Sequence, residues 1–349
     1  MPRQVRIEYE GAIYHCLARG DRREPIVLDD FDRKAFESLL EELVGKTGWK
    51  LFAWVLMDNH YHLAIKTPEA NLVAGMKWLQ NTWTKRFNAR HRLWGHVFGG
   101  RYKAVLVEDG AYLGSLINYI HLNPARAGLT KVASGVENYP WSSLPDYTGP
   151  KRARRSWVSV AEGLEEMRYQ DSAADRRKYV GHLEDIALQD RKKAGWIVPE
   201  GNDLHSTLRR GWCFGSEAFR EKITDQFSHL MNAGRKGRRR KASGFTGEET
   251  GGHTEARAEE VVVAGLKALG IKDKELEFLK KGDWRKAMIA RSIRSRTTVP
   301  MAWIAQRLQM GVTGRVSHAV RLLAEQEAGD RKLRSQGRKL EQFLSKNID

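Results

Sequence analysis

The sequence of 349 residues is poor in cysteine and has no long apolar run. Its two cysteines, Cys16 and Cys213, lie far apart and form no CxxC pattern, which argues against a disulfide framework and a cysteine zinc site. No apolar stretch reaches the length of about 18 residues that a membrane span needs, and the N-terminal segment MPRQVRIEYEG lacks the apolar region of a signal peptide. We therefore expect a cytoplasmic protein with no membrane partner, in which both thiols are ordinary buried side chains.

The chain is long enough for two or three domains, at roughly 150 residues per domain, and it contains no internal repeat of fixed period. Its net charge is +17, and residues 151–349 supply most of that excess, with 41 Lys and Arg against 27 Asp and Glu. Such a charge is typical of proteins that bind polyphosphate, although a solvated basic surface without a partner gives the same count. The charge therefore predicts a nucleic acid partner.

The first 150 residues alternate between strand and helix patterns. Strands are predicted at residues 13–19, 49–57, 60–66 and 101–107. Helices are predicted from residue 29 to either Gly45 or Gly48, at residues 71–90 and at residues 111–127. The two-residue turn Asp58-Asn59 predicts a hairpin between the second and third strands. The resulting order, β-α-β-β-α-β-α, is that of a split βαβ unit, so we expect an α+β, ferredoxin-like domain with an antiparallel sheet over residues 1–150.

The remaining residues divide by composition. After the prolines that end the first domain, residues 151–233 show helical patterns of unknown role, residues 234–255 form a basic, glycine-rich linker, and residues 256–349 are helical again. In the last region, residues 297–323 predict a helix-turn-helix, with its turn at Met310-Gly311-Val312. Two packed helices with no role in binding are the alternative.

If this motif binds duplex DNA, the start of its second helix faces the major groove. The side chains concerned are those of Thr313, Arg315, Ser317 and His318. Arg315 is the foremost candidate for a contact with a base or a phosphate, because a guanidinium can bind either.

The stretch DNHYHLAIK, residues 58–66, holds two histidines in an apolar strand. Residues two apart in a strand project from the same face, so His60 and His62 present two imidazoles side by side while Tyr61 points to the other face. This is the geometry of half a metal site, and imidazole suits several divalent metals. The same spacing also fits two hydrogen-bonded surface histidines that bind nothing.

The stretch NYIHLNPARAG supplies two further groups. Tyr119 and Asn123 are four residues apart, so they lie about one turn apart on one face of a helix. Asn123 offers an oxygen ligand, and Tyr119 offers a nucleophile for a phosphodiester that a nearby cation polarises. The alternative is that Tyr119 is a core residue and that Asn123 caps the helix before Pro124.

Five stretches in order, covering roughly residues 5–147, resemble the single-tyrosine class of HUH transposases, and most closely its REP-associated branch. They are YHCLARGDRREPIVLDD, WVLMDNHYHLAIKTP, GHVFGGRYKAVLVED, INYIHLNPARAGL and YPWSS. The resemblance implies a metal-dependent endonuclease and strand transferase that acts on single-stranded DNA at hairpins through a 5′-phosphotyrosine. It implies that Tyr119 is the nucleophile and that His60, His62 and Asn123 bind Mg²⁺ or Mn²⁺. Tyr112, two turns before Tyr119, is interpreted as a packing residue.

Several basic residues are candidates for holding the DNA, and each is equally well explained as a solvated surface charge. They are Arg19, Arg22, Arg23, Arg101, Lys103 and Arg126, with Arg315 in the C-terminal region. A protein that binds hairpin DNA as a regulator without cutting it is the alternative function. The expected partners are single-stranded hairpin DNA and, through the helix-turn-helix, duplex DNA, and the protein is a monomer or a homodimer.

Overall fold

The computed structural model describes residues 7–130, 135–192, 211–227 and 249–348. The chain folds as two compact units, a first that spans most of residues 1–245 and a second that spans residues 246–349. Within the first unit, buried residues beyond position 150, among them Val158, Tyr179 and Ile223, share one hydrophobic core with the sheet. The predicted helical region at 151–233 therefore packs, where it is described, onto the predicted catalytic domain.

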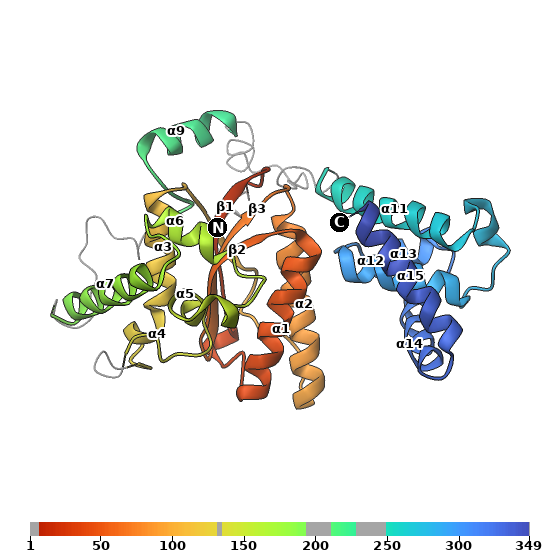
Figure 1. The fold of residues 1–349 in the computed structure, drawn as a ribbon, viewed down its shortest axis with the longest axis horizontal. Helices are drawn as coiled ribbons and strands as arrows, with labels where there is room; N and C mark the ends of the chain where they lie inside the picture. The colour runs from red at the N-terminus through yellow and green to blue at the C-terminus, as the bar shows by residue number, and fades with distance from the viewer. Residues whose placement is uncertain (1–6, 131–134, 193–210, 228–248, 349) are drawn as a thin grey trace. The chain divides into compact units, whose positions relative to one another are not determined.

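The first unit is built on a sheet with helices on both faces (Figure 1). Its main strands are β1 (Ala12–Arg19), β2 (Lys50–Leu56), β3 (His60–Thr67) and β4 (Lys103–Val107), in the spatial order β2-β3-β1-β4 with every pair antiparallel. The predicted α+β, ferredoxin-like order is thus confirmed. The strands of residues 1–150 form an antiparallel sheet, as predicted, and β5 (Cys213–Phe214), from beyond that domain, adds an edge strand that pairs parallel to β4. Two residues carry no periodicity from which such a strand could be predicted.

Local chemistry explains where the first elements begin and end. Helix α1 (Asp30–Thr47) starts after Asp29, whose side chain accepts a hydrogen bond from the Asp32 N–H at 2.9 Å. It ends at Gly48, whose φ of 67° lies in the left-handed region that glycine adopts freely. The hairpin between β2 and β3 closes where predicted, with the Met57 N–H donating to the His60 carbonyl at 2.8 Å.

Helices α1 and α2 (Leu72–His91) cover one face of the sheet, and α3 (Ala111–His121) covers the other (Figure 1). Tyr61 is fully buried on the first face against Phe36 of α1, with 5.3 Å between the ring centroids. The alternation predicted for the histidine strand is therefore confirmed. The prediction of one helix over residues 111–127 is wrong in one respect, because α3 stops at His121 and α4 (Asn123–Arg126) follows. Pro124 has no N–H to donate to the carbonyl four residues earlier, which interrupts the hydrogen-bond ladder.

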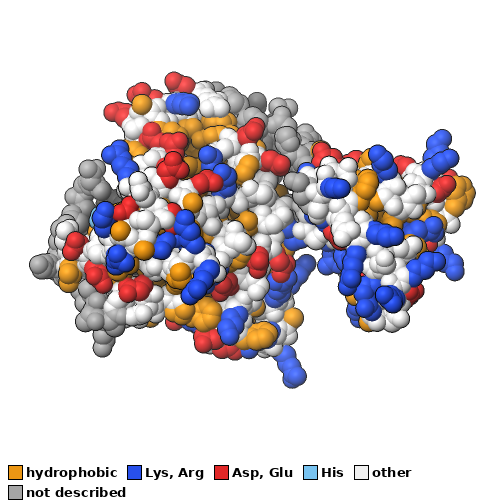
Figure 2. Space-filling model, viewed as in Figure 1, with side chains coloured by type: hydrophobic (Ala, Val, Ile, Leu, Met, Phe, Trp, Pro, Cys, Tyr) orange, Lys and Arg blue, Asp and Glu red, His pale blue; other side chains and the backbone are white. Residues whose placement is uncertain are grey.

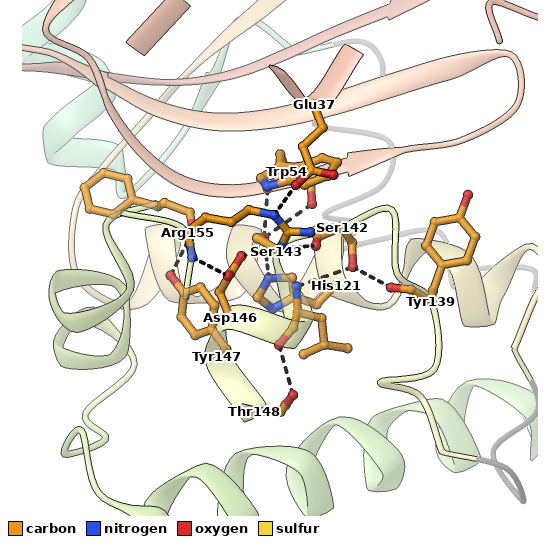
Figure 3. Close-up of polar contacts among 12 residues, drawn as sticks. Glu37, Trp54, His121, Tyr139, Ser142, Ser143, Asp146, Tyr147, Thr148 and Arg155 are labelled. Carbon is orange, nitrogen blue, oxygen red and sulfur yellow. Dashed lines mark hydrogen bonds and ion pairs between the residues drawn. The ribbon is translucent and has the colours of Figure 1, made fainter. Parts of the chain in front are cut away.

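The free edge of β2 is covered by the YPWSS segment, residues 139–143. The Leu56 N–H donates to the Trp141 carbonyl and the Ser143 N–H to the Trp54 carbonyl, each at 2.9 Å. The Ser143 hydroxyl also accepts from the Trp54 N–H at 2.9 Å and bonds to His121 Nε2 at 2.8 Å (Figure 3). The segment both protects an edge strand and fixes the end of α3, because His121 belongs to that helix.

Shorter elements complete the first unit. They are the 3₁₀ turns η1 (Asp21–Arg23) and η3 (Lys151–Ala153) and the helices α5 (Leu144–Thr148), α6 (Val160–Glu166), α7 (Ala173–Lys192) and α9 (Glu217–Gln226). Both cysteines are buried free thiols, as predicted.

The second unit is helical, with a core of its own around Ile289, Ile304 and Leu323. Its elements are α11 (Glu249–Leu269), η4 (Asp273–Glu277), α12 (Trp284–Arg296), α13 (Met301–Arg307), α14 (Thr313–Gly329) and α15 (Arg331–Asn347). Helix α11 begins inside the predicted linker at 234–255, whose earlier residues lie outside the described part. In the parts of the chain that the structure describes, we find no helix whose length and hydropathy suit a bilayer crossing.

Two packed helices, α13 and α14, occupy the positions predicted for the helix-turn-helix. Gln309 and Gly311, in the turn between them, have φ of 51° and 88°. The buried Lys286 of α12 donates to the carbonyls of Leu279 and Gln309, both at 3.2 Å, and so holds the turn against the core.

Candidate functional site

His60 and His62 lie on the α3 face of β3, with 5.1 Å between their ring centroids. The Nδ1 atom of each ring has a hydrogen-bond partner: for His60 it is Asn59 Oδ1 at 2.7 Å, and for His62 it is His15 Nε2 at 2.8 Å. When Nδ1 carries the proton in such a bond, Nε2 keeps a lone pair for a ligand. The pair therefore has the ring placement that a two-histidine metal site requires.

His15, on β1, is a site residue that the sequence reasoning missed. Antiparallel pairing places Leu17 opposite His62, which puts His15 beside His62 on the same face. The two imidazoles are stacked, with centroids 5.0 Å apart and planes within 5°. Burial lowers the pKa of His15 to about 3, with the charge of Lys103 as a smaller cause, so the ring is neutral at pH 7. In the sequence, the only sign that His15 belongs to the site was the presence of a histidine within an apolar strand.

Tyr119 projects from α3 onto these rings and is 6% exposed. Its ring meets those of His15 and His62 edge to face, at centroid distances of 5.9 and 5.7 Å. The guanidinium of Arg126 lies 5.4 Å from its centroid and is held by Asp190 through hydrogen bonds of 2.9 and 3.0 Å. The predicted nucleophile and one predicted ligand are thus neighbours. Tyr112, by contrast, packs against Phe214 of β5, as predicted.

Asn123 stands at the start of α4 and reaches His60. Burial lowers the pKa of His60 to about 4, and the charge of Arg19 lowers it further, while a hydrogen bond with Asn123 opposes the shift. The Asn123 amide also donates to the Tyr119 carbonyl at 3.5 Å. Two imidazoles and an amide oxygen are a donor set that suits a small divalent cation. Among the described residues no group of three or more His, Cys, Asp and Glu forms a metal site, so a site here depends on the amide.

The predicted DNA-binding residues divide by place. Arg19 lies opposite His60 in the β1–β3 register, and Lys103 lies opposite Leu17, in the same row as His62. Arg22 and Arg23 follow in η1, and both are exposed with positive φ. All four therefore surround the histidine end of the sheet.

The other candidates are placed differently. Arg101 is exposed just before β4, and Arg315 is exposed on α14 in the second unit. Arg126 forms an ion pair with Asp190, and its guanidinium lies 5.4 Å from the ring centroid of Tyr119.

Comparison with known proteins agrees with these motifs. Residues 8–123 match the family model described as "Transposase IS200 like". A solved structure described as "Structure of the REP associates tyrosine transposase bound to a REP hairpin" aligns with 41% of this chain and 82% of that chain, at 17% identity and a TM-score of 0.35. No curated protein matches the chain. Residues 8–123, about a third of the chain, are thus similar to the IS200-like transposases, in agreement with the motifs.

Proposed function

We propose that this protein is a metal-dependent endonuclease and strand transferase for single-stranded DNA, acting in the cytoplasm at hairpins of the REP type. The motifs of the REP-associated branch favour the hairpin substrate. The observation that carries the catalytic proposal is the meeting of Tyr119 with His62, at a ring distance of 5.7 Å, beside the hydrogen-bonded pair of His60 and Asn123. A tyrosine that served only to fill the core would not need metal-binding side chains such as His62 and Asn123 beside it.

His60, His62 and Asn123 would hold Mg²⁺ or Mn²⁺. When bound, such a cation polarises the scissile phosphate and offsets the charge that develops on it. The chain's own residues prepare this site: Asn59 and His15 fix the two rings through their Nδ1 atoms, and the low pKa of His60 keeps that ring neutral at pH 7.

Tyr119 would attack the scissile phosphorus through its phenolic oxygen. The new bond joins that oxygen to phosphorus, the bond from phosphorus to the 3′ oxygen breaks, and the proton lost by the phenol is balanced by the proton gained by the 3′-OH. The phosphodiester energy stays in the phosphotyrosine, so the 3′-OH of a second strand can reverse the attack without ATP. Arg126 restrains the tyrosine ring during both steps.

The basic residues near the histidines would bind the DNA backbone. Arg19 pairs directly with His60 across β1 and β3. Lys103 of β4 pairs with Leu17 of β1, which in turn pairs with His62 of β3. Phosphate contacts of this kind fix the register of a strand and weaken as salt rises.

The test is incubation of labelled single-stranded hairpin DNA with the protein and Mn²⁺, followed by a denaturing gel. We expect a protein-linked product from the wild type and none from Tyr119→Phe. Tyr112→Phe, on the same helix but packed against Phe214, is the matched control and should still form the product. Equal behaviour of wild type and Tyr119→Phe would refute the nuclease and leave hairpin binding without cleavage.

We also propose that the second unit binds duplex DNA through α13 and α14. Thr313, Arg315, Ser317 and His318 are all exposed on α14. Figure 2 shows Lys and Arg side chains gathered over the part of this unit that holds α14 and α15. Arg315→Ala should weaken duplex binding by roughly 1–3 kcal/mol if it reads a base, or reduce the salt dependence by about one ion if it contacts a phosphate. Unchanged binding of duplex DNA would contradict this role.

A further inference from the structure

The break between α3 and α4 separates two groups of the proposed site, because Tyr119 belongs to α3 and Asn123 is the first residue of α4. We propose that α7, in the region 151–233 whose role is unknown from the sequence, holds the two helices in one arrangement, with Tyr179 and Asp190 as positioning residues for the nucleophile. The proposal rests on the proposed function in taking Tyr119 as that nucleophile.

The two helices need such support because α4 is short. It has four residues, fewer than a helix needs to be stable by itself, so its direction depends on contacts with the rest of the chain. The contact that joins it directly to the tyrosine, from the Asn123 amide to the Tyr119 carbonyl, is 3.5 Å long. A hydrogen bond of that length is weak. The distance between the tyrosine and the proposed ligand is therefore set by the neighbours of the break.

Tyr179 of α7 supports the α3 side of the break. Its hydroxyl lies 2.7 Å from Nδ1 of His121, two residues after Tyr119, and the side chains of Tyr179 and His121 are both buried. Nε2 of His121 is bonded in turn to the Ser143 hydroxyl at 2.8 Å (Figure 3). Because both ring nitrogens have partners, moving the last turn of α3 would leave buried polar groups unpaired. Tyr179 and Ser143 therefore fix the helix end that follows the nucleophile.

Asp190 of α7 supports the α4 side of the break. It accepts two hydrogen bonds from Arg126, from Nε at 3.0 Å and from Nη2 at 2.9 Å. The guanidinium held in this way lies 5.4 Å from the ring centroid of Tyr119, within the range of a cation–π contact. The Arg126 and Asp190 side chains are 26% and 29% exposed, and ion pairs of that kind contribute little to folding stability. The main contribution of Asp190 is therefore to place a cation against the tyrosine ring.

Helix α7 links these two contacts rigidly. Tyr179 and Asp190 are eleven residues apart, which is about 16 Å along the helix axis. Between them, Leu183 and Ala187 are buried in the core of the first unit. Figure 1 shows α3, α4 and α7 on the same side of the sheet. A helix that is anchored at its middle and bonded to both sides of the break keeps them in one arrangement, although it lies beyond the matched residues 8–123.

The first test measures the single-turnover rate at which the full-length protein forms the covalent product with labelled hairpin DNA and Mn²⁺, alongside its affinity for the same hairpin. For Asp190→Ala we expect a rate roughly 10- to 100-fold lower, the effect of misplacing a reacting group by about 1 Å, with unchanged hairpin affinity. Arg126→Ala should lose as much, and the double variant no more than either single one, because the two residues act through one contact. Asp190→Glu, which keeps a carboxylate, should recover most of the rate.

Tyr179→Phe keeps the aromatic ring but removes the hydroxyl that bonds to His121, so it should also slow the reaction at unchanged hairpin affinity. Lys178→Ala is the matched control, since Lys178 is 71% exposed and pairs at 2.8 Å with Asp175 of the same helix. It should leave rate and affinity unchanged. An Asp190→Ala rate equal to that of the wild type would overturn the proposal. So would an equal loss of rate and hairpin affinity, which would show that the ion pair serves DNA binding.

The second test needs no cleavage. The Arg126 and Ala127 N–H groups donate to the Leu122 and Asn123 carbonyls, each at 2.9 Å, and their hydrogen exchange measures local opening at the break. Asp190→Ala should speed this exchange by up to about fivefold, the effect of losing a partly exposed ion pair, and leave the amides of β1 and β3 unchanged. Wild-type exchange at both amides would contradict the support by α7.

The two proposals fail separately. A wild type that forms no covalent product, with faster exchange in Asp190→Ala, retains the support of α3 and α4 by α7 and loses the endonuclease. A wild type that forms the product, with Asp190→Ala equal to it in rate and in exchange, retains the endonuclease and loses the support by α7.

Discussion

Replacing His15 with phenylalanine tests whether a residue that contacts no substrate prepares the proposed metal site. The substitution keeps an aromatic ring between β1 and Tyr119 but removes the Nε2 atom that lies 2.8 Å from His62 Nδ1. Loss of a partner that orients a metal-binding histidine typically lowers metal affinity by roughly 10- to 100-fold, which is about 1.4–2.7 kcal/mol of binding free energy. We expect this loss of affinity for Mn²⁺, measured by isothermal titration calorimetry or from the electron paramagnetic resonance signal of the free ion.

The same substitution should have little effect on folding, because two changes oppose each other. His62 Nδ1 loses its partner, which costs on the order of 1–3 kcal/mol, while the buried His15 Nδ1, which has no partner within the described residues, is removed. Urea unfolding should therefore give a free energy of unfolding close to that of the wild type.

Cys16→Ala, on the same strand but facing the other way, is the control for damage to β1, and Tyr119→Phe should also bind Mn²⁺ normally. If His15→Phe binds Mn²⁺ as tightly as the wild type, the orienting role of His15 is wrong.

Three further predictions concern stability, each measured by urea unfolding. Burial lowers the pKa of His121 to about 3, so the unfolded chain binds more protons at this site below pH 6.5. The contribution of His121 to stability is complete above that pH and falls by on the order of 2–3 kcal/mol by pH 4.5, and a His121→Gln variant whose stability falls as steeply as that of the wild type would contradict this. Ser143→Ala should cost roughly 1–3 kcal/mol, since the Trp54 N–H and His121 both lose a buried partner; a change within 0.5 kcal/mol would contradict that estimate. Gly48→Ala, at φ of 67°, should lower the free energy of unfolding by about 1 kcal/mol, whereas Gly45→Ala inside α1 should raise it by up to about 1 kcal/mol. Changes of the same sign at both positions would refute the argument from backbone conformation.

The sequence by itself determined the local structure of the first unit. Asp29 and Gly48 bound α1 because a side-chain cap and a left-handed glycine act on the nearest turn of helix only. The placing of His60 and His62 on one face, with Tyr61 on the other, follows from the two-residue period of a strand. The motifs around these residues also predicted the similarity of residues 8–123 to the IS200-like transposases.

Other features depend on which distant segments meet, and only the tertiary structure decided them. His15 became a partner of His62 because β1 pairs with β3, a register that no local pattern in β1 contains. Trp83 and Trp94 are the same kind of residue eleven positions apart, yet one is buried in the core and the other is 91% exposed. Burial and pairing are set by contacts between residues remote in sequence, and for this reason the partner of His62 and the different surroundings of the two tryptophans appear only in the folded chain.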